Sequence, residues 1–307
     1  MILFAGIPSE TPLALAIAAA ERLCLPHVVL NQRQSAHVDL SMAWTEAGLG
    51  GALWIGDAHY PLDCFTGIYA RAIEAAALPE LRPRGRRDPD EPARVRTQVL
   101  TDLFNDLLDI HPARVANRPS AMGSNLSKPY QAQLVQAAGL LTPETLITND
   151  AQAVRAFHAA HRRIVYKSVS AVRSIVREWS PAIGPDLGAV ARLPTQFQAF
   201  VPGVNIRVHV VGDRLFATEI VSEAIDYRYG ERDGLDTAMI PAEIPQAIAD
   251  ACLRLTADLG LMLSGIDLKR TPRGEWYCFE VNPSPAYSYF EELGGQPIAE
   301  ALVGALS

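Results

Sequence analysis

The chain has 307 residues, of which 49% are hydrophobic and 20% are charged, and its formal net charge is −7. This length suffices for two domains, or for one large domain with subdomains, and the composition is typical of a globular protein. The acidic balance argues against a nucleic-acid partner, because phosphate binding needs a basic surface. No apolar run is long enough to span a bilayer, so no membrane partner is expected. The four cysteines show no CxxC spacing, which favours reduced thiols in a cytoplasmic protein.

The N-terminal third predicts a parallel sheet. MILFAGI (1–7) reads as a buried strand, residues 9–23 as a helix with Ser9 or Thr11 as N-cap, and PHVVLN (26–31) as a second strand. Strand, helix and strand within about 30 residues indicate a βαβ unit. GALWIG (51–56) and CFTGIYAR (64–71) predict further strands of the same layer. We expect an N-terminal domain over residues 1–115.

The rest of the chain alternates helices with strand-rich stretches. Helices are predicted over 127–140, from Asn149 or Asp150, and over 245–261, whereas residues 162–179 predict a β-hairpin. Residues 195–223 have strand character, with Gly212 and Asp213 as a hairpin turn. The expected fold class is therefore α/β (α+β).

A last hairpin carries the first chemical signal. SGIDLKR (264–270) and EWYCFEVN (275–282) flank the turn TPRG (271–274). With that turn as the loop, Asp267 would oppose Cys278, and Glu280 would lie one diagonal step from Asp267, with Asn282 one step further. The opposite face would be apolar and suited to a core, with Ile266, Leu268, Tyr277, Phe279 and Val281.

Two carboxylates and an amide on one face suit a hard cation such as Mg²⁺ or Mn²⁺ better than zinc. The alternative is a solvent-facing polar edge of the hairpin. The rigid NPSP turn after Glu280 favours a metal site, but the hairpin alone leaves both interpretations open.

Two lysines and two arginines add possible phosphate contacts. Lys128 opens a helix, where backbone N–H groups favour an anion, although a surface role is also open. Lys167 lies within the apolar strand IVYKSV, where an ammonium needs a partner or must reach to solvent. Arg207 lies within the strand-like stretch NIRVHVV, and Arg228 follows a predicted strand. Both suit charge on a transferring phosphoryl group, or ordinary salt bridges.

Read in order, these pieces resemble the ATP-grasp superfamily. The resemblance rests on SNLSKPYQAQLVQAAGLLTPET, IVYKSVSAVRSIV, QFQAFVPGVNIRVHVVG, AIDYRYG and GIDLKR…CFEVNPSP, and it covers residues 116 to 307. Within the superfamily the chain looks most like the ribosomal-protein glutamate ligases and the ligases that crosslink graspetide precursor peptides. The resemblance implies an N-terminal pre-grasp domain followed by two ATP-grasp subdomains, over 116–195 (with the lid hairpin) and 196–307 (with the metal and phosphate site).

The resemblance also implies roles for individual residues. Lys128 and Lys167 match the two lysines that hold ATP, and Arg207 and Arg228 match basic residues near the γ-phosphate and the acyl phosphate. Asp267, Glu280 and Asn282 match the ligands of two magnesium ions. The remaining cofactor-binding positions lie in the lid and in the linker that reads adenine, namely Ser168, Ser170, Arg173, Gln198, Ala199, Phe200, Val201 and Asn205.

Some positions depart from the family pattern. The lid segment SVSAVRS lacks the usual glycines, Ala199 stands where many relatives have an acidic residue, and Asn205 stands where an aspartate is common. These departures concern contacts to adenine and ribose, whereas the metal face keeps its residue types.

The implied activity is an ATP-dependent ligase that joins a carboxylate to an amine or hydroxyl through an acyl phosphate. A peptide or protein substrate is expected, in graspetide-type crosslinking or glutamate-ligase-like extension. The alternatives are a small-molecule amino-acid ligase, a catalytically silent nucleotide-binding protein and a phosphotransferase that stops at phosphorylation. The apolar N-terminal layer is also compatible with a homodimer.

Overall fold

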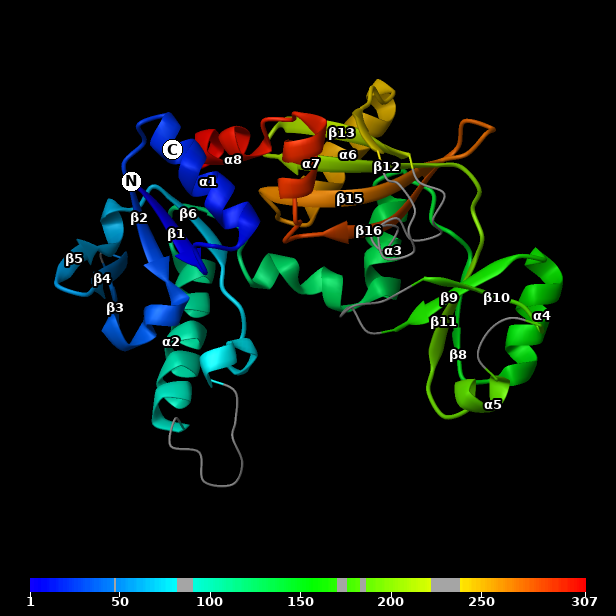
Figure 1. Ribbon diagram of the computed structural model, residues 1–307, viewed down its shortest axis with the longest axis horizontal. Coiled ribbons are helices and arrows are strands. Elements are labelled where there is room, and N and C mark those ends of the chain that lie inside the picture. The colour runs from blue at the N-terminus through cyan, green and yellow to red at the C-terminus, as the bar shows by residue number, and fades with distance from the viewer. Residues whose placement is uncertain (47, 82–90, 170–175, 183–185, 222–237) are drawn as a thin grey trace.

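The computed structural model describes residues 1–46, 48–81, 91–169, 176–182, 186–221 and 238–307, and within these ranges the chain forms four β-sheets (Figure 1). The N-terminal sheet is parallel, has the order β2-β1-β6-β7, and consists of β1 (Ile2–Gly6), β2 (His27–Asn31), β6 (Gly67–Arg71) and β7 (Arg114–Ala116). Strand β1 is buried along its whole length, as expected for a parallel sheet covered by helices. The predicted parallel sheet is confirmed.

Three helices pack around this sheet: α1 (Thr11–Arg22), α2 (Glu91–Ile110) and α8 (Ile298–Leu306). Helix α8 comes from the C-terminal end of the chain and lies against α1 (Figure 1), where Leu302 and Leu306 join the same core as Phe4. The predicted N-cap of α1 is wrong. Glu10 caps this helix instead, because its carboxylate accepts a hydrogen bond from the backbone N–H of Leu13 at 3.2 Å.

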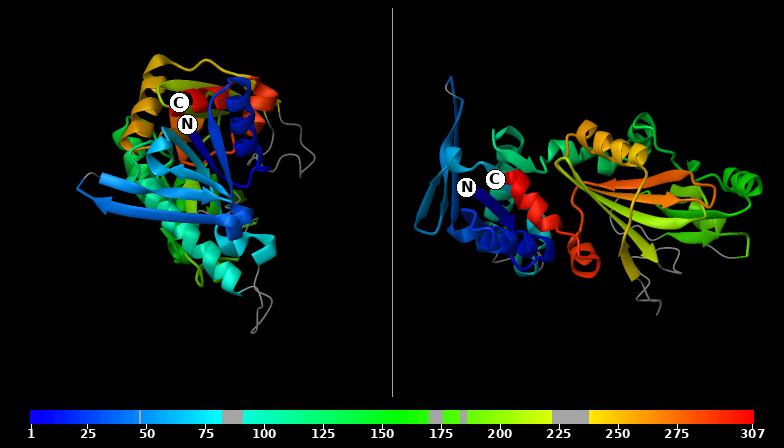
Figure 2. Two further views of the ribbon diagram at one scale, coloured as in Figure 1. Left: turned by 90° about the vertical axis from the view of Figure 1, so that its left-hand side faces the viewer. Right: turned by 90° about the horizontal axis from the view of Figure 1, so that it is seen from above.

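Residues 51–56 do not belong to the parallel layer, contrary to the prediction. Residues 51–55 lie in β4 (Gly48–Ile55), which pairs antiparallel with β3 (Val38–Thr45) and β5 (Ala58–Pro61) in a separate ribbon that extends from the domain (Figure 2). Only two residues separate β3 from β4, and such a short connection allows antiparallel pairing but no parallel crossover.

The second sheet, here called the lid sheet, is antiparallel with the order β10-β9-β11-β8. Its strands are β8 (Thr145–Thr148), β9 (Ile164–Ser168), β10 (Arg177–Trp179) and β11 (Thr195–Ala199), and β9 with β10 confirms the predicted hairpin. Helices α4 (Ala151–His161) and α5 (Leu187–Val190) accompany it, with a small core around Val154, Trp179 and Phe197. The opposite face of this sheet borders the candidate site described below.

The largest sheet, here called the central sheet, has the order β14-β13-β12-β15-β16. Its strands are β12 (Val204–Val211), β13 (Arg214–Val221), β14 (Ala238–Pro241), β15 (Leu263–Arg270) and β16 (Trp276–Asn282). Gly212 takes a φ of 59° in the turn between β12 and β13, as predicted. The accompanying helices are α3 (Lys128–Ala137), α6 (Gln246–Asp258) and α7 (Ser288–Gly294).

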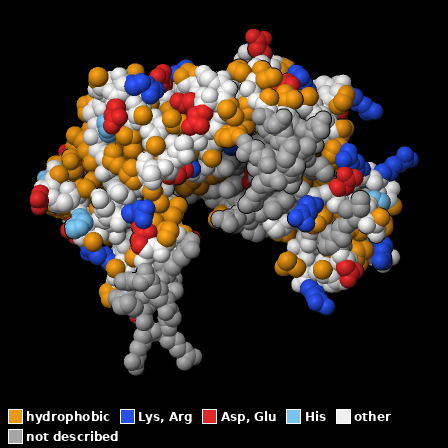
Figure 3. Space-filling view, viewed as in Figure 1, with side chains coloured by type: hydrophobic (Ala, Val, Ile, Leu, Met, Phe, Trp, Pro, Cys, Tyr) orange, Lys and Arg blue, Asp and Glu red, His pale blue; other side chains and the backbone are white. Residues whose placement is uncertain are grey.

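Acidic and basic side chains are interspersed on the face seen in Figure 3. Within the described ranges no helix combines the length and the apolarity needed to cross a bilayer.

Candidate active site

A cleft of about 800 Å³ lies where the lid sheet adjoins the central sheet. Strand β9 contributes Lys167 to its wall, β15 contributes Asp267, and β16 contributes Glu280. The chain from β11 to the start of β12 adds five more of the predicted site residues, namely Gln198, Ala199, Phe200, Val201 and Asn205. The fold therefore brings together eight residues that are spread over more than a hundred positions of the sequence.

A second cavity, of about 780 Å³, contains Lys128 at the start of α3. The two cavities share Gln198 and Phe279 as lining residues, so they adjoin each other at the inner face of the lid sheet. Lys128 and Lys167 thus lie in neighbouring cavities rather than in one. The side chain of Gln196 borders the second cavity, and its Oε1 is buried with no hydrogen-bond partner within the described residues.

The carboxylate pair is closer than the sequence predicted. Asp267 lies directly opposite Glu280, whereas Cys278 lies opposite Leu268, because a β-bulge shifts the register between Asp267 and Leu268. The extra residue of a bulge cannot be seen in an alternating pattern. Direct cross-strand neighbours have Cβ atoms about 4.5–5.5 Å apart, so this pair is better placed to share a cation than diagonal neighbours would be.

The bulge also exchanges the faces of the residues before it. Cys278 and Trp276 are buried in the core, whereas Phe279 lines both cavities. The prediction that Tyr277 and Phe279 face the core is therefore wrong. Phe279 is a cleft residue that the sequence pattern missed.

Lys269 is a further cleft residue that the sequence did not single out. Its ammonium lies 5.5 Å from the ring centroid of Phe200 and 5.6 Å from that of Phe279. Burial, with a smaller contribution from the nearby Arg163 charge, lowers the pKa of Lys269.

Arg207 forms an ion pair with Asp267, one of the two carboxylates. Its Nη1 donates to Oδ1 of Asp267 at 2.7 Å, and its side chain is only 7% exposed. Arg228, Ser170 and Arg173 lie outside the described residues, and Ser168 is exposed at the end of β9.

Side chains from other elements hold strand β16 in place. Gln131 of α3 accepts from the backbone N–H of Val281 and donates to its carbonyl, both at 2.9 Å, in the manner of a neighbouring strand. Asn117 donates to the carbonyl of Pro283 at 2.6 Å. Both side chains are buried, so the backbone on each side of Asn282 is fixed from outside the sheet.

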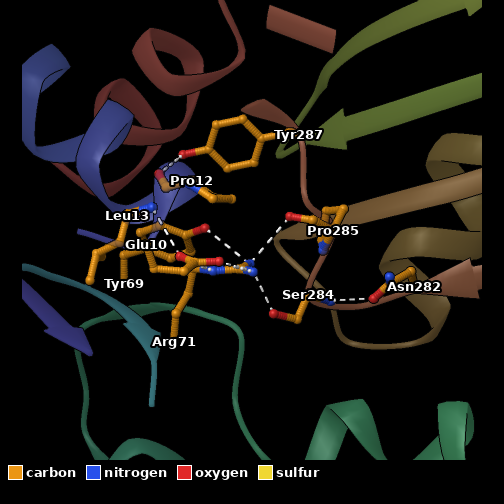
Figure 4. Close-up of polar contacts among 9 residues, drawn as sticks. All are labelled: Glu10, Pro12, Leu13, Tyr69, Arg71, Asn282, Ser284, Pro285 and Tyr287. Carbon is orange, nitrogen blue, oxygen red and sulfur yellow. Dashed lines mark hydrogen bonds and ion pairs between the residues drawn. The ribbon is translucent and has the colours of Figure 1, made fainter. Parts of the chain in front are cut away.

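The turn after Asn282 is anchored to the N-terminal sheet (Figure 4). Arg71, at the end of β6, donates to Oγ of Ser284 at 2.9 Å and to the carbonyl of Pro285 at 3.2 Å. The same guanidinium forms a bidentate ion pair with the carboxylate of Glu10, at 2.7 and 2.8 Å. Within the turn, the backbone N–H of Ser284 donates to Oδ1 of Asn282 at 2.9 Å, which fixes the direction of this amide.

These residues fit a magnesium–nucleotide complex. In the described part of the chain no group of three or more His, Cys, Asp and Glu side chains has the arrangement of a metal site. The carboxylates of Asp267 and Glu280 and the amide of Asn282 would hold such an ion together with water and phosphate oxygens. Mg²⁺ is usually bound in this way, by one or two carboxylates and substrate phosphates.

Comparison with known proteins places the fold. No protein-family model matches the chain. It is 37% identical over 75 residues to a D-alanine–D-alanine ligase of Cereibacter sphaeroides, which covers 24% of this chain and 23% of that protein. It is 34% identical over 99 residues to the D-alanine–D-alanine ligase of Rhizorhabdus wittichii, covering 29% and 32%. The matches thus span only about a quarter to a third of these curated relatives.

Solved structures match over nearly the whole chain. A RiPP-associated ATP-grasp ligase of Chryseobacterium gregarium, in complex with ADP and a leader and core peptide, has a TM-score of 0.81 at 19% identity and covers 99% of this chain and 96% of that one. The macrocyclase MdnC of Microcystis aeruginosa, bound to the precursor peptide MdnA, has a TM-score of 0.79 at 22% identity and covers 99% and 98%. The ATP-grasp ligase PsnB with a minimal precursor has a TM-score of 0.78 at 23% identity and covers 100% and 99%.

The chain therefore has the ATP-grasp fold, with its cleft between a lid sheet and a central sheet. The expected fold class is confirmed, and among these ATP-grasp structures the chain resembles ligases solved with precursor peptides.

Proposed function

We propose that this protein is an ATP-dependent ligase that joins a carboxylate to an amine or hydroxyl through an acyl phosphate. The observation that carries the proposal is the single cleft that gathers Lys167, Asp267 and Glu280 beside the end of β11. A cation and a carboxylate pair suited to Mg²⁺ are parts that phosphoryl transfer from ATP requires.

Each residue has a proposed part in this reaction. Asp267, Glu280 and Asn282 hold two Mg²⁺ or Mn²⁺ ions, and Lys128 and Lys167 bind the ATP phosphates. Arg207 and Arg228 stabilise charge on the γ-phosphate and on the acyl phosphate. Adenine lies along Gln198 to Val201 with Asn205 nearby, and Ser168, Ser170 and Arg173 cover the phosphates, excluding the water that would hydrolyse the acyl phosphate.

We further propose a peptide or protein as the substrate. Three structures that match nearly the full length of this chain contain a precursor or core peptide. In this proposal the N-terminal domain (1–115) helps to form the pocket for the acceptor substrate, and the subdomains 116–195 and 196–307 bind ATP and the ions. The reaction takes place in the cytoplasm, where ATP is available and the four cysteines stay free. The local matches to D-alanine–D-alanine ligases favour a second candidate, a ligase for small amino acids.

Product analysis tests the proposal. The protein is incubated with ATP, Mg²⁺ and synthetic peptides that combine Glu or Asp with Lys, Thr or Ser, and ADP and product masses are followed. A peptide ligase releases ADP as the peptide loses one water for each bond formed, and Glu280→Gln abolishes both. Water loss between free amino acids identifies the small-molecule ligase, a stable phosphorylated product identifies a phosphotransferase, and no ADP with either substrate class contradicts the proposal.

A further inference from the structure

The guanidinium of Arg207 is enclosed by Asp267, His209, Phe290 and Gly265, and these surroundings are here called its seat. On one side Nη1 donates to Asp267 at 2.7 Å, and on another Nε donates to Nε2 of His209 at 3.4 Å. The ring of Phe290 closes the seat, with its centroid 5.8 Å from Cζ. The direction of the guanidinium is therefore set by several contacts as well as by the ion pair.

Gly265 forms the floor of this seat. It lies opposite His209 on β12 and opposite Asn282 on β16. A Cβ atom added to Gly265 would lie 2.1 Å from Nη2 of Arg207 and 2.6 Å from its Cζ, which is far inside van der Waals contact. Its backbone is not in the left-handed region that favours glycine. The missing side chain is thus needed for the space that Arg207 fills.

The other neighbour of that Cβ has little freedom to move. Cβ of Pro285 would be 2.7 Å away, and Pro285 is buried, with its carbonyl held by Arg71 (Figure 4). A methyl group at position 265 would therefore push the guanidinium away from Asp267.

His209 supplies the second directional contact. It is fully buried, its ring packs edge-on against Phe290 at 4.7 Å, and its pKa lies well below the usual value because of burial and the Arg207 charge. A neutral imidazole that accepts at Nε2 carries its proton on Nδ1. That Nδ1 is buried with no partner within the described residues, so the contact to Arg207 is the polar interaction that this ring makes there.

We propose that Gly265 and His209 are positioning residues that hold the guanidinium of Arg207 beside Asp267, aimed at the transferred phosphate. The inference rests on the proposed function, in which Arg207 stabilises charge that develops during phosphoryl transfer. A charged donor is most effective when it is already in place before the reaction, and an arginine on a flexible stem needs such a seat.

A double-mutant cycle tests the seat with kcat and the KM for ATP as readouts. We expect Gly265→Ala to lower kcat by about 100-fold or more, the scale of losing one preorganised donor, with little change in the KM for ATP. In an Arg207→Ala background, Gly265→Ala should change kcat less than about threefold, because truncation of the arginine frees the space. An equal loss of kcat in both backgrounds would overturn the proposal.

Two variants test whether His209 must accept a hydrogen bond from Arg207. His209→Gln keeps an acceptor and should retain most of the kcat, whereas His209→Leu should lose about 10-fold or more; equal losses would overturn this half of the proposal. The coupling of Gly265 and Arg207 is also measured by urea unfolding, which needs no activity. Arg207→Ala should recover the stability that Gly265→Ala loses, and this coupling in a protein that never releases ADP would refute the proposed function while supporting the seat.

Discussion

Arg71 offers the sharpest test of how the N-terminal sheet supports the cleft. Its guanidinium joins Glu10 to the turn after Asn282, and only 11% of its side chain is exposed. Arg71→Met keeps the length of the side chain but removes its charge and its donors. Glu10 is then left without its partner, and the carbonyl of Pro285 and the hydroxyl of Ser284 each lose a donor.

The size of the loss follows from the burial of the pair. Breaking a fully buried ion pair costs about 3–5 kcal/mol of unfolding free energy. Glu10 is 35% exposed and keeps its bond to the N-terminus of α1, so water compensates for part of the loss, and we expect about 2–4 kcal/mol.

Urea denaturation of the wild type and the variant measures this value. Arg33 and Glu80 provide the control, because they form a pair of the same chemistry, at 2.6 and 3.2 Å, with 51% of the Arg33 side chain exposed. Arg33→Met should cost less than about 1 kcal/mol. If the two variants lose the same small amount of stability, the interpretation of Arg71 as a buried anchor is refuted.

Three further predictions concern the cleft and the N-terminal core. Glu280→Gln should abolish ADP release and weaken Mn²⁺ binding in the presence of ADP, while the melting temperature stays within a few degrees of the wild type; unchanged Mn²⁺ affinity would rule out Glu280 as a ligand. Lys167→Ala should raise the KM for ATP at least 10-fold, measured by ADP release, and an unchanged KM would return Lys167 to a structural role. His111, whose Nδ1 accepts from Ala113 N–H at 3.0 Å and whose pKa burial lowers, resists protonation in the native state. Below pH about 6.5 the unfolded chain binds a proton that the native chain does not, so stability should fall by up to about 1.4 kcal/mol per pH unit for this residue. In urea titrations at pH 7 and pH 5.5, His111→Gln should lose less stability on acidification than the wild type, whereas the exposed control His59→Gln should lose as much as the wild type. If His111→Gln loses as much stability as the wild type, His111 is not the source of the pH dependence.

Local patterns in the sequence were enough to predict the parallel N-terminal sheet, the three hairpins and the residue types in the cleft. These features depend on local signals: alternation, turn residues, helix caps and apolar runs. The proposed ion ligands Asp267, Glu280 and Asn282 could be grouped from the sequence because all three lie on the two strands of one tight hairpin. The resemblance to ATP-grasp ligases added the order in which Lys128, Lys167 and Arg207 precede them.

Features that depend on long-range packing could not be predicted from the sequence. The bulge between β15 and β16 leaves no recognisable signal in the sequence pattern. It nevertheless places Asp267 opposite Glu280 and directs Phe279 toward the cleft. The pairing of β4 with its own hairpin partner was missed because an apolar strand fits either sheet. The stretch FEVNPSP (279–285) is held by the side chains of Asn117, Gln131 and Arg71, and each of these contacts joins residues at least 150 positions apart. Such contacts leave no periodicity in the chain, since they are specified by how its layers pack rather than by neighbours in sequence.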